Sequence, residues 1–159
     1  MYLLNELRYT DPKSEVWVAP KGSKVNGASI PKAFWSFTGG PFEGKYRNAA
    51  VLHDVAYEKQ DRPWQEVDLM FYHAMRCSGV GAVKAKTLYY ALRRHGRHWD
   101  QPTRRATAAQ ETVAPAERTS SITPGDVNAI EKWIETSDPS LREIEARAAG
   151  EGQAQSRHF

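Results

Sequence analysis

The residues of this chain that are equipped for acid–base chemistry lie between positions 53 and 68. His53 and Asp54 are adjacent, Tyr57 follows one helical turn later, and Asp68 comes after a short polar break. A neutral imidazole can take a proton from water near neutral pH. A carboxylate on its other ring nitrogen fixes the tautomer and stabilises the imidazolium. The set indicates a general-base site in which Tyr57 and Asp68 orient His53. A buried structural network is the alternative.

Two short helices joined by a tight turn are expected to position these side chains. The first begins near Asn48 and has one face at three- and four-residue spacing, formed by Ala49, Ala50, His53, Ala56 and Tyr57. The second opens near 61–63 and carries an apolar stripe with Asp68 at its edge, formed by Val67, Met70, Phe71, Ala74 and Met75. Antiparallel packing of the two helices would bring Asp68 towards His53. A third helix is expected from about Ala82 to His95.

A glycine-rich stretch precedes the first helix, with Gly39, Gly40 and Gly44 within six residues. Glycines this close together allow positive φ and let the backbone turn its carbonyls or amides to one side. The stretch is either a plain connector or a cradle for an oxyanion or a cation. In the second case Asp54 and the loop carbonyls would hold calcium, which prefers oxygen ligands and would polarise an ester carbonyl.

Composition and charge predict one α+β domain, mainly α, with an appendage. Residues 1–20 read as a small β element with a turn at Asp11–Pro12, and the compact domain should span 1–99. That part carries 15 Lys and Arg against 9 Asp and Glu, whereas residues 100–159 carry 7 against 10. Cys77 is the single cysteine, so an internal disulfide is excluded. We expect neither a signal peptide nor a transmembrane segment.

The C-terminal part is predicted to consist of a polar linker over 100–122 and a flexible extension over 123–159. Thr123 and Pro124 have the residue types of a helix N-cap and first position, and a second short helix should start at 137–139. Such short helices are unstable alone, so their apolar stripes need a surface, either the first domain or a neighbouring chain. The candidate partner-binding residues are Val127, Ile130, Trp133, Ile134, Leu141 and Ile144.

The motif HDVAY at 53–57 and the later DLMF at 68–71 resemble the active site of phospholipase A2, in particular the disulfide-free phospholipase domains of parvovirus capsids. The resemblance implies that His53 is the base, that Asp54 is a calcium ligand, and that Tyr57 and Asp68 orient the histidine. Gly39 and Gly40 would then belong to the calcium loop.

A second resemblance covers about residues 14–95. The stretches VWVAPKGSKVNGASIPKAFW, AAVLHDVAY and VDLMFYHAM are similar, in this order, to a phage and prophage family known as domain of unknown function 1353, or DUF1353. This resemblance implies a phage origin without an established activity.

Two functions are compatible with these patterns. The first is a phage-encoded, calcium-dependent, phospholipase A2-like hydrolase that acts on membrane lipid. The second is a non-enzymatic virion or tail protein whose extension binds neighbouring virion subunits or a second copy of itself. Either would place the chain in the virion or the host cytoplasm. Nucleic acid is not an expected partner, because Lys and Arg at a helix end are usually just solvated.

Overall fold

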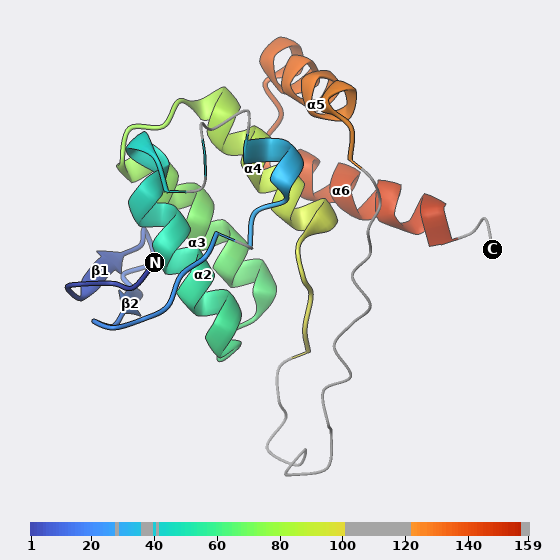
Figure 1. Cartoon of the computed structure of the whole chain (residues 1–159). Helices are drawn as coiled ribbons and strands as arrows, with labels where there is room; N and C mark the ends of the chain where they lie inside the picture. The colour runs from blue at the N-terminus through green and yellow to red at the C-terminus, as the bar shows by residue number, and fades with distance from the viewer. Residues whose placement is uncertain (28, 36–39, 41, 101–121, 157–159) are drawn as a thin grey trace.

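The structure is a computed structural model, and it describes residues 1–27, 29–35, 40, 42–100 and 122–156 (Figure 1). Two strands, β1 (Leu7–Thr10) and β2 (Val16–Ala19), are followed by the short 3-10 helices η1 (Lys32–Phe34) and η2 (Gly44–Tyr46). The α-helices of the described residues are α2 (Arg47–Lys59), α3 (Trp64–Cys77), α4 (Ala82–His95), α5 (Pro124–Ser137) and α6 (Leu141–Ser156). The predicted fold class, α+β and mainly α, is confirmed.

The N-terminal β element is an antiparallel hairpin whose register pairs Leu7 with Ala19 and Thr10 with Val16. Its turn is fixed by Asp11. One carboxylate oxygen accepts hydrogen bonds from the backbone N–H groups of Lys13 and Glu15, and the other accepts one from the indole of Trp17 at 3.0 Å. Such Asx-type bonds are why aspartate favours turns, and the turn predicted at Asp11–Pro12 is confirmed.

The central helix pair has the predicted order and a four-residue connection. α2 ends with Gln60 in the left-handed conformation, at a φ of 51°, and its backbone N–H bonds the carbonyl of Ala56. The second helix was expected to open near 61–63, and Pro63 is the residue immediately before α3. The two helices therefore pack side by side with a tight turn between them, as the spacing of the apolar residues indicated.

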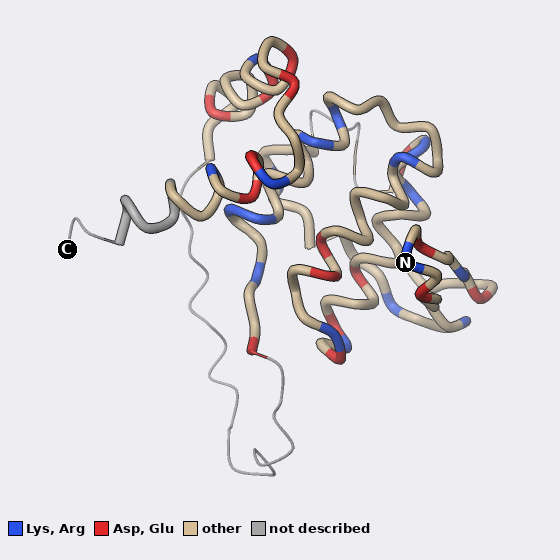
Figure 2. Tube along the Cα trace, turned by 180° about the vertical axis from the view of Figure 1, so that it is seen from behind, with Lys and Arg blue, Asp and Glu red and all other residues tan. Residues whose placement is uncertain are grey.

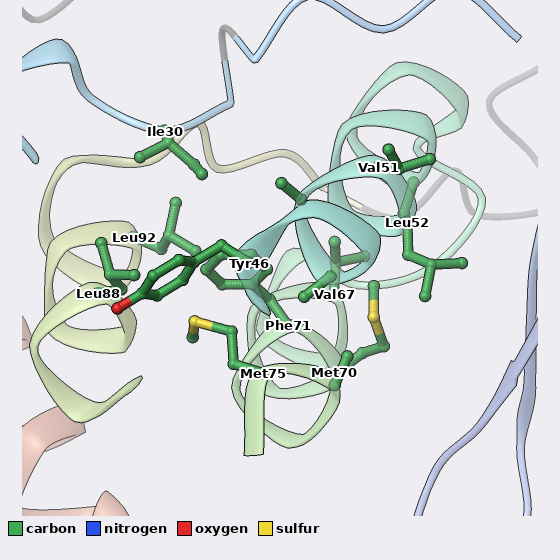
Figure 3. Packing of buried hydrophobic residues seen from close by; sticks show 14 of the residues in the cluster. Ile30, Tyr46, Val51, Leu52, Val67, Met70, Phe71, Met75, Leu88 and Leu92 are labelled. Carbon is green, nitrogen blue, oxygen red and sulfur yellow. The ribbon is translucent and has the colours of Figure 1, made fainter. Parts of the chain in front are cut away.

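Helix α2 is buried on every side rather than along one stripe. Its nine consecutive residues from Ala49 to Tyr57 are all buried. Figure 3 shows the core in which the helix lies: Val51 and Leu52 of α2 pack in one cluster with Met70 and Phe71 of α3 and Leu88 of α4. A helix enclosed in this way carries neighbouring side chains into different parts of the interior. This is why His53 and Asp54, about a hundred degrees apart around the helix, are both buried.

The C-terminal helices α5 and α6 pack on α4, on the side away from the β hairpin (Figure 1). Thr123 caps α5 as predicted, and it exchanges hydrogen bonds with Asp126 in a capping box. The start predicted for the next helix was wrong by a few residues. Asp138 takes a φ of 40° and ends α5, and Ser140 and Glu143 form the reciprocal bonds that begin α6.

The candidate partner-binding residues of this extension lie against the chain's own helices. Val127 joins the main core. Ile130, Ile134 and Ile144 are buried in a second cluster with Tyr89 and Tyr90 of α4, and Trp133 and Leu141 pack at its edge. Of the two surfaces that the sequence left open, the first domain is the one used in this structure.

Polar contacts add to this packing. Lys86 donates to Asp138 at 2.8 Å, and the hydroxyl of Tyr89 donates to Glu145 at 2.6 Å. Figure 2 shows acidic residues on α5, while Lys and Arg residues follow the end of α4. Between the two parts of the sequence, Lys86 and Arg93 of α4 pair with Asp138 and Glu145.

The described residues contain no helix with the length and apolar character that crossing a bilayer requires. Cys77 ends α3 and is an exposed free thiol. The greater part of the predicted linker, residues 101–121, lies outside the described residues.

Candidate active site

The structure brings His53, Asp68 and Tyr57 together in the core between α2 and α3. Nε2 of His53 lies 2.9 Å from Oδ1 of Asp68, and neither side chain has any exposed surface. The hydroxyl of Tyr57 donates to the same Asp68 oxygen at 3.0 Å. Because an ionised carboxylate only accepts hydrogen bonds, this pairing places the imidazole proton on Nε2 and leaves Nδ1 as an acceptor.

Aromatic rings surround His53, Tyr57 and Asp68, which together are called the trio below. The His53 ring lies 4.2 Å from the Tyr57 ring and 4.8 Å from the Phe71 ring, measured between centroids. Burial, and after it the nearby Asp68 carboxylate, raise the pKa of Tyr57 well above its ordinary value. The phenol therefore stays protonated at physiological pH and remains a donor to Asp68.

Three buried side-chain polar atoms lack a hydrogen-bond partner within the described part of the chain: Nδ1 of His53, Oδ2 of Asp68 and Oγ of Ser29. Two of them belong to the trio, and the third belongs to a residue whose backbone contacts the carboxylate of Asp54. An unpaired buried polar atom costs about 1–3 kcal/mol, so proteins rarely keep one without a role. Two of the three unpaired atoms therefore belong to residues that the sequence marked for chemistry, His53 and Asp68.

The carboxylate of Asp54 accepts hydrogen bonds from the backbone of residues that precede the helix pair. Its Oδ2 accepts backbone N–H groups of Asn26 at 2.8 Å and Gly27 at 3.1 Å, and its Oδ1 faces the N–H of Ser29 at 3.4 Å. Gly27 has a φ of 76°, a left-handed conformation that turns its amide to the carboxylate. The side chain of Asp54 thus fixes the backbone of Asn26, Gly27 and Ser29 on α2; these three residues are called the 26–29 loop below.

These contacts do not fit a calcium site. Calcium needs several oxygen ligands, whereas the described neighbours of the Asp54 carboxylate are N–H donors. Of the two proposed loop glycines, Gly39 lies outside the described residues. Gly40 has a φ of 119°, and a β-carbon there would contact the side chain of Glu43.

The segment after α4 closes the tyrosine side of the trio. A β-carbon on Gly96 would lie 2.5 Å from the hydroxyl oxygen of Tyr57, so this position is occupied by the one residue that leaves room. Trp99 packs edge-on against the Tyr57 ring at 5.0 Å and donates its indole N–H to the carbonyl of Arg62. Sequence reasoning did not find Gly96, Trp99 or the 26–29 loop. Gly96 carried a signal, as a glycine after a helix, but it indicated only a helix end.

A family model described as "Protein of unknown function (DUF1353)" matches residues 1–92. The chain belongs to this family. The DUF1353 match contains the hairpin, the 26–29 loop, α2, α3 and most of α4, and thus all residues of the trio. It ends before Gly96.

Two curated relatives come from Sinorhizobium fredii (strain NBRC 101917 / NGR234). Uncharacterized protein y4jT is 41% identical over 102 residues, which is 64% of this chain and 30% of that protein. Uncharacterized protein y4iH is 40% identical over 91 residues, 57% of this chain and 38% of that protein. The matched part of the chain thus spans about a third of the length of these relatives. No solved structure gives a significant match.

Proposed function

We propose that the chain is an ester hydrolase acting on membrane phospholipid, with His53 as the general base. One observation carries the proposal. The imidazole has one nitrogen held by a carboxylate and a phenol, while its other nitrogen has no partner among the described residues. A histidine that served only to join two helices would gain by pairing both nitrogens.

In the proposed reaction Nδ1 of His53 takes a proton from a water molecule, whose oxygen attacks the ester carbonyl carbon. Asp68 stabilises the imidazolium, and Tyr57 holds Asp68 in place. The tetrahedral intermediate then collapses with cleavage of the bond to the leaving alcohol, which receives the proton from the imidazolium. The products are the free fatty acid and the lysolipid.

Phospholipid is proposed as the substrate because HDVAY and DLMF resemble the phospholipase A2 motifs. With the proposed phage origin, such an activity would act on the membrane that a phage crosses to infect or leave its host. Calcium remains the cofactor that this resemblance implies, and it enters the experiment as a variable.

The burial of His53 sets a condition on this function. The ring has no exposed surface, so an ester can reach Nδ1 only after the segments packed around it move apart. Contact with a lipid surface is the event proposed to open the site. Hydrolysis of vesicles should then exceed hydrolysis of the same ester dispersed as monomers.

The test is fatty-acid release from phosphatidylglycerol vesicles, with calcium and with a chelator. We expect release by the wild type and at least about a 10²-fold loss in His53→Gln, because general-base catalysis contributes this much or more. His73→Gln is the matched control, since His73 also lies on the helix pair but contacts Tyr72 rather than the trio. Equal rates for His53→Gln and the wild type would refute the proposal.

A second function, a structural protein of the virion or tail, is favoured by one observation. His53 and Asp68 are completely buried, as expected for a network that fixes two helices. On this account no ester is cleaved, and His53→Gln lowers stability alone. Virion proteins or further copies of the chain would then be the partners. Sedimentation of the full chain would reveal an oligomer, and a monomer at all concentrations would count against self-assembly.

A further inference from the structure

We propose that residues 1–4 and 21–24, called the N-terminal surface below, bind the headgroup region of an anionic phospholipid bilayer. The inference rests on the proposed function for its partner, and it assigns the surface by which the chain would meet its substrate. These residues lie beside the β hairpin, on the side of the molecule away from α5 and α6 (Figure 1). The DUF1353 match includes them but gives them no role.

The exposed large apolar side chains of the described residues are concentrated in this part of the chain. They are Met1, Tyr2, Leu4 and Val16, and the first three belong to the N-terminal surface. Leu4 is 80% exposed and Tyr2 is 64% exposed, whereas Leu3 between them packs against the main core. Single exposed apolar residues are ordinary on protein surfaces, but adjacent ones often mark a site of interaction.

Backbone hydrogen bonds hold these side chains in place. The N–H of Leu3 donates to the carbonyl of Ser23 at 2.9 Å, and the carbonyl of Leu3 accepts the N–H of Gly22 at 2.7 Å. Next to this pair, the N–H of Val25 donates to the carbonyl of Met1 at 2.9 Å. The two segments of the N-terminal surface are thus paired with each other, and the exposed apolar side chains stand on a fixed backbone.

Lysines flank the exposed apolar residues. Tyr2 and Lys24 are opposite each other in an antiparallel bridge whose hydrogen bonds run between their neighbours. The side chains of such a pair leave the same face, with β-carbons about 5 Å apart. Lys21 is exposed three residues earlier. The ion pairs within the described part of the chain include neither lysine, whereas the nearby Glu6 is paired with Arg8.

This combination fits a bilayer surface better than a protein partner. Leucine and tyrosine side chains enter the boundary between headgroups and acyl chains, and lysine ammonium groups are attracted to anionic lipid. A stable protein interface takes about 20–30 residues from each side, far more than these two segments offer. Binding to a membrane instead grows with each buried apolar side chain and each basic charge, so a small surface gives reversible attachment.

The N-terminal surface leads directly into the loop beside the proposed base. Shortly after Lys24 come Asn26 and Gly27, whose backbone N–H groups bond the carboxylate of Asp54. Asp54 directly follows His53 on α2. A bilayer bound at Lys24 is therefore connected to the helix of the proposed base through one hydrogen-bonded loop, as opening of the site by a lipid surface would require.

The test is co-sedimentation of the full chain with phosphatidylglycerol vesicles. The double variant Tyr2→Ser with Leu4→Ser should bind at least about 10-fold more weakly, because two apolar side chains no longer enter the interface. Lys24→Gln should bind about 5-fold more weakly, because one cationic contact with anionic lipid is lost. Val16→Ser and Lys13→Gln are the matched controls and should bind like the wild type, since both positions are exposed but lie at the turn end of the hairpin.

Loss of binding must be distinguished from loss of the fold. The substituted side chains are exposed, so the Tm of each variant should stay close to that of the wild type. Wild-type binding by the double variant would overturn the inference, and so would a wild type that does not bind the vesicles. Sedimentation without vesicles tests a second copy as the occupant. An oligomer that the double variant dissociates would likewise overturn the inference.

Fatty-acid release in the same samples separates this inference from the proposed function. A wild type that binds the vesicles through the N-terminal surface but releases no fatty acid would refute the hydrolase and leave the surface assigned. Release from vesicles at the wild-type rate by the double variant would refute the surface and leave the hydrolase. Parallel losses of binding and of release in the double variant, with both retained in Val16→Ser, are the result expected if both are right.

Discussion

Gly96 lies so close to Tyr57 that a β-carbon at position 96 would stand 2.5 Å from the tyrosine hydroxyl oxygen. The backbone of Gly96 has an ordinary φ of −68°, so space rather than conformation requires glycine here. The same hydroxyl donates to Asp68, which in turn holds His53. A residue outside the family match is thus in contact with the trio.

Gly96→Ala should lower the free energy of unfolding by about 1–3 kcal/mol, the usual cost of an added methyl in a packed interior. The new β-carbon would meet both the Tyr57 hydroxyl and the carbonyl of Leu92. Denaturant unfolding measures the change. Gly125→Ala is the control, because its β-carbon would make only an ordinary contact at 3.6 Å, and it should change stability by less than about 0.5 kcal/mol.

A double-mutant cycle tests the contact itself. Tyr57→Phe removes the hydroxyl, so Gly96→Ala should cost less in that background than in the wild type. Equal costs in the two backgrounds would assign the whole cost to the carbonyl of Leu92 and none to the Tyr57 hydroxyl.

Asp54→Ala should release the 26–29 loop whether or not calcium is present. The loss of hydrogen bonds from Asn26 and Gly27 to a charged acceptor should lower the free energy of unfolding by about 2 kcal/mol or more. Hydrogen exchange of the Gly27 amide should accelerate in parallel. Asp61→Ala, at an exposed position in the turn after α2, is the control. A protected Gly27 amide in Asp54→Ala would contradict this assignment.

The C-terminal helices should be less stable in acid than at neutral pH. Hydrogen bonds from the backbone N–H groups of Thr123 and Ser140 lower the pKa of Asp126 and Glu143, and a hydrogen bond from Lys86 lowers the pKa of Asp138. A carboxyl whose pKa is lower in the folded state stabilises the fold above its unfolded pKa, and this contribution disappears as the pH falls through the folded value.

The contribution of these three carboxyls should therefore be complete above about pH 5, decrease below about pH 4, and disappear as the pH falls through their lowered folded pKa values. Amide exchange of α5 and α6, followed from pH 6 to pH 3, measures it. The variant Asp126→Asn with Glu143→Gln should show a weaker dependence on pH. An unchanged dependence in that variant would exclude the two caps as its source.

Ile144→Ala should lower the free energy of unfolding by about 2–5 kcal/mol, because the side chain is fully buried against α4. Arg142→Ala, on an exposed position of the same helix, should change it by less than about 0.5 kcal/mol. Equilibrium denaturation of both variants decides whether the apolar face of the extension is used within the chain. Similar small effects would leave that face free for a partner.

The helices and the approach of His53, Tyr57 and Asp68 to one another could be predicted from the sequence. The spacing of apolar residues predicted α2, α3 and α4, and a four-residue connection makes antiparallel packing nearly unavoidable, so Asp68 had to approach His53 and Tyr57. The sequence also contains the capping pair Ser140 and Glu143, which marks the start of α6 more precisely than the residues at 137–139 do.

The remaining features depend on contacts that no local pattern contains. Asp54 bonds residues 25 to 28 positions away, and Gly96 matters because of a tyrosine 39 positions earlier. A glycine after a helix and an aspartate next to a histidine each have common local explanations. Only the three-dimensional arrangement distinguishes an anchor for a loop from a ligand for a metal.

The tether from Trp99 to Arg62 has a practical consequence for anyone who works with related chains. An expression fragment cut at residue 92, where the family match stops, would lack both Gly96 and Trp99 and would leave the phenol of Tyr57 uncovered on one side. Inactivity or poor solubility of such a fragment would then reflect the choice of its boundary rather than the chemistry of the domain. Fragments that extend through residue 100 keep both residues, and fragments that extend through residue 156 also keep α5 and α6 on α4.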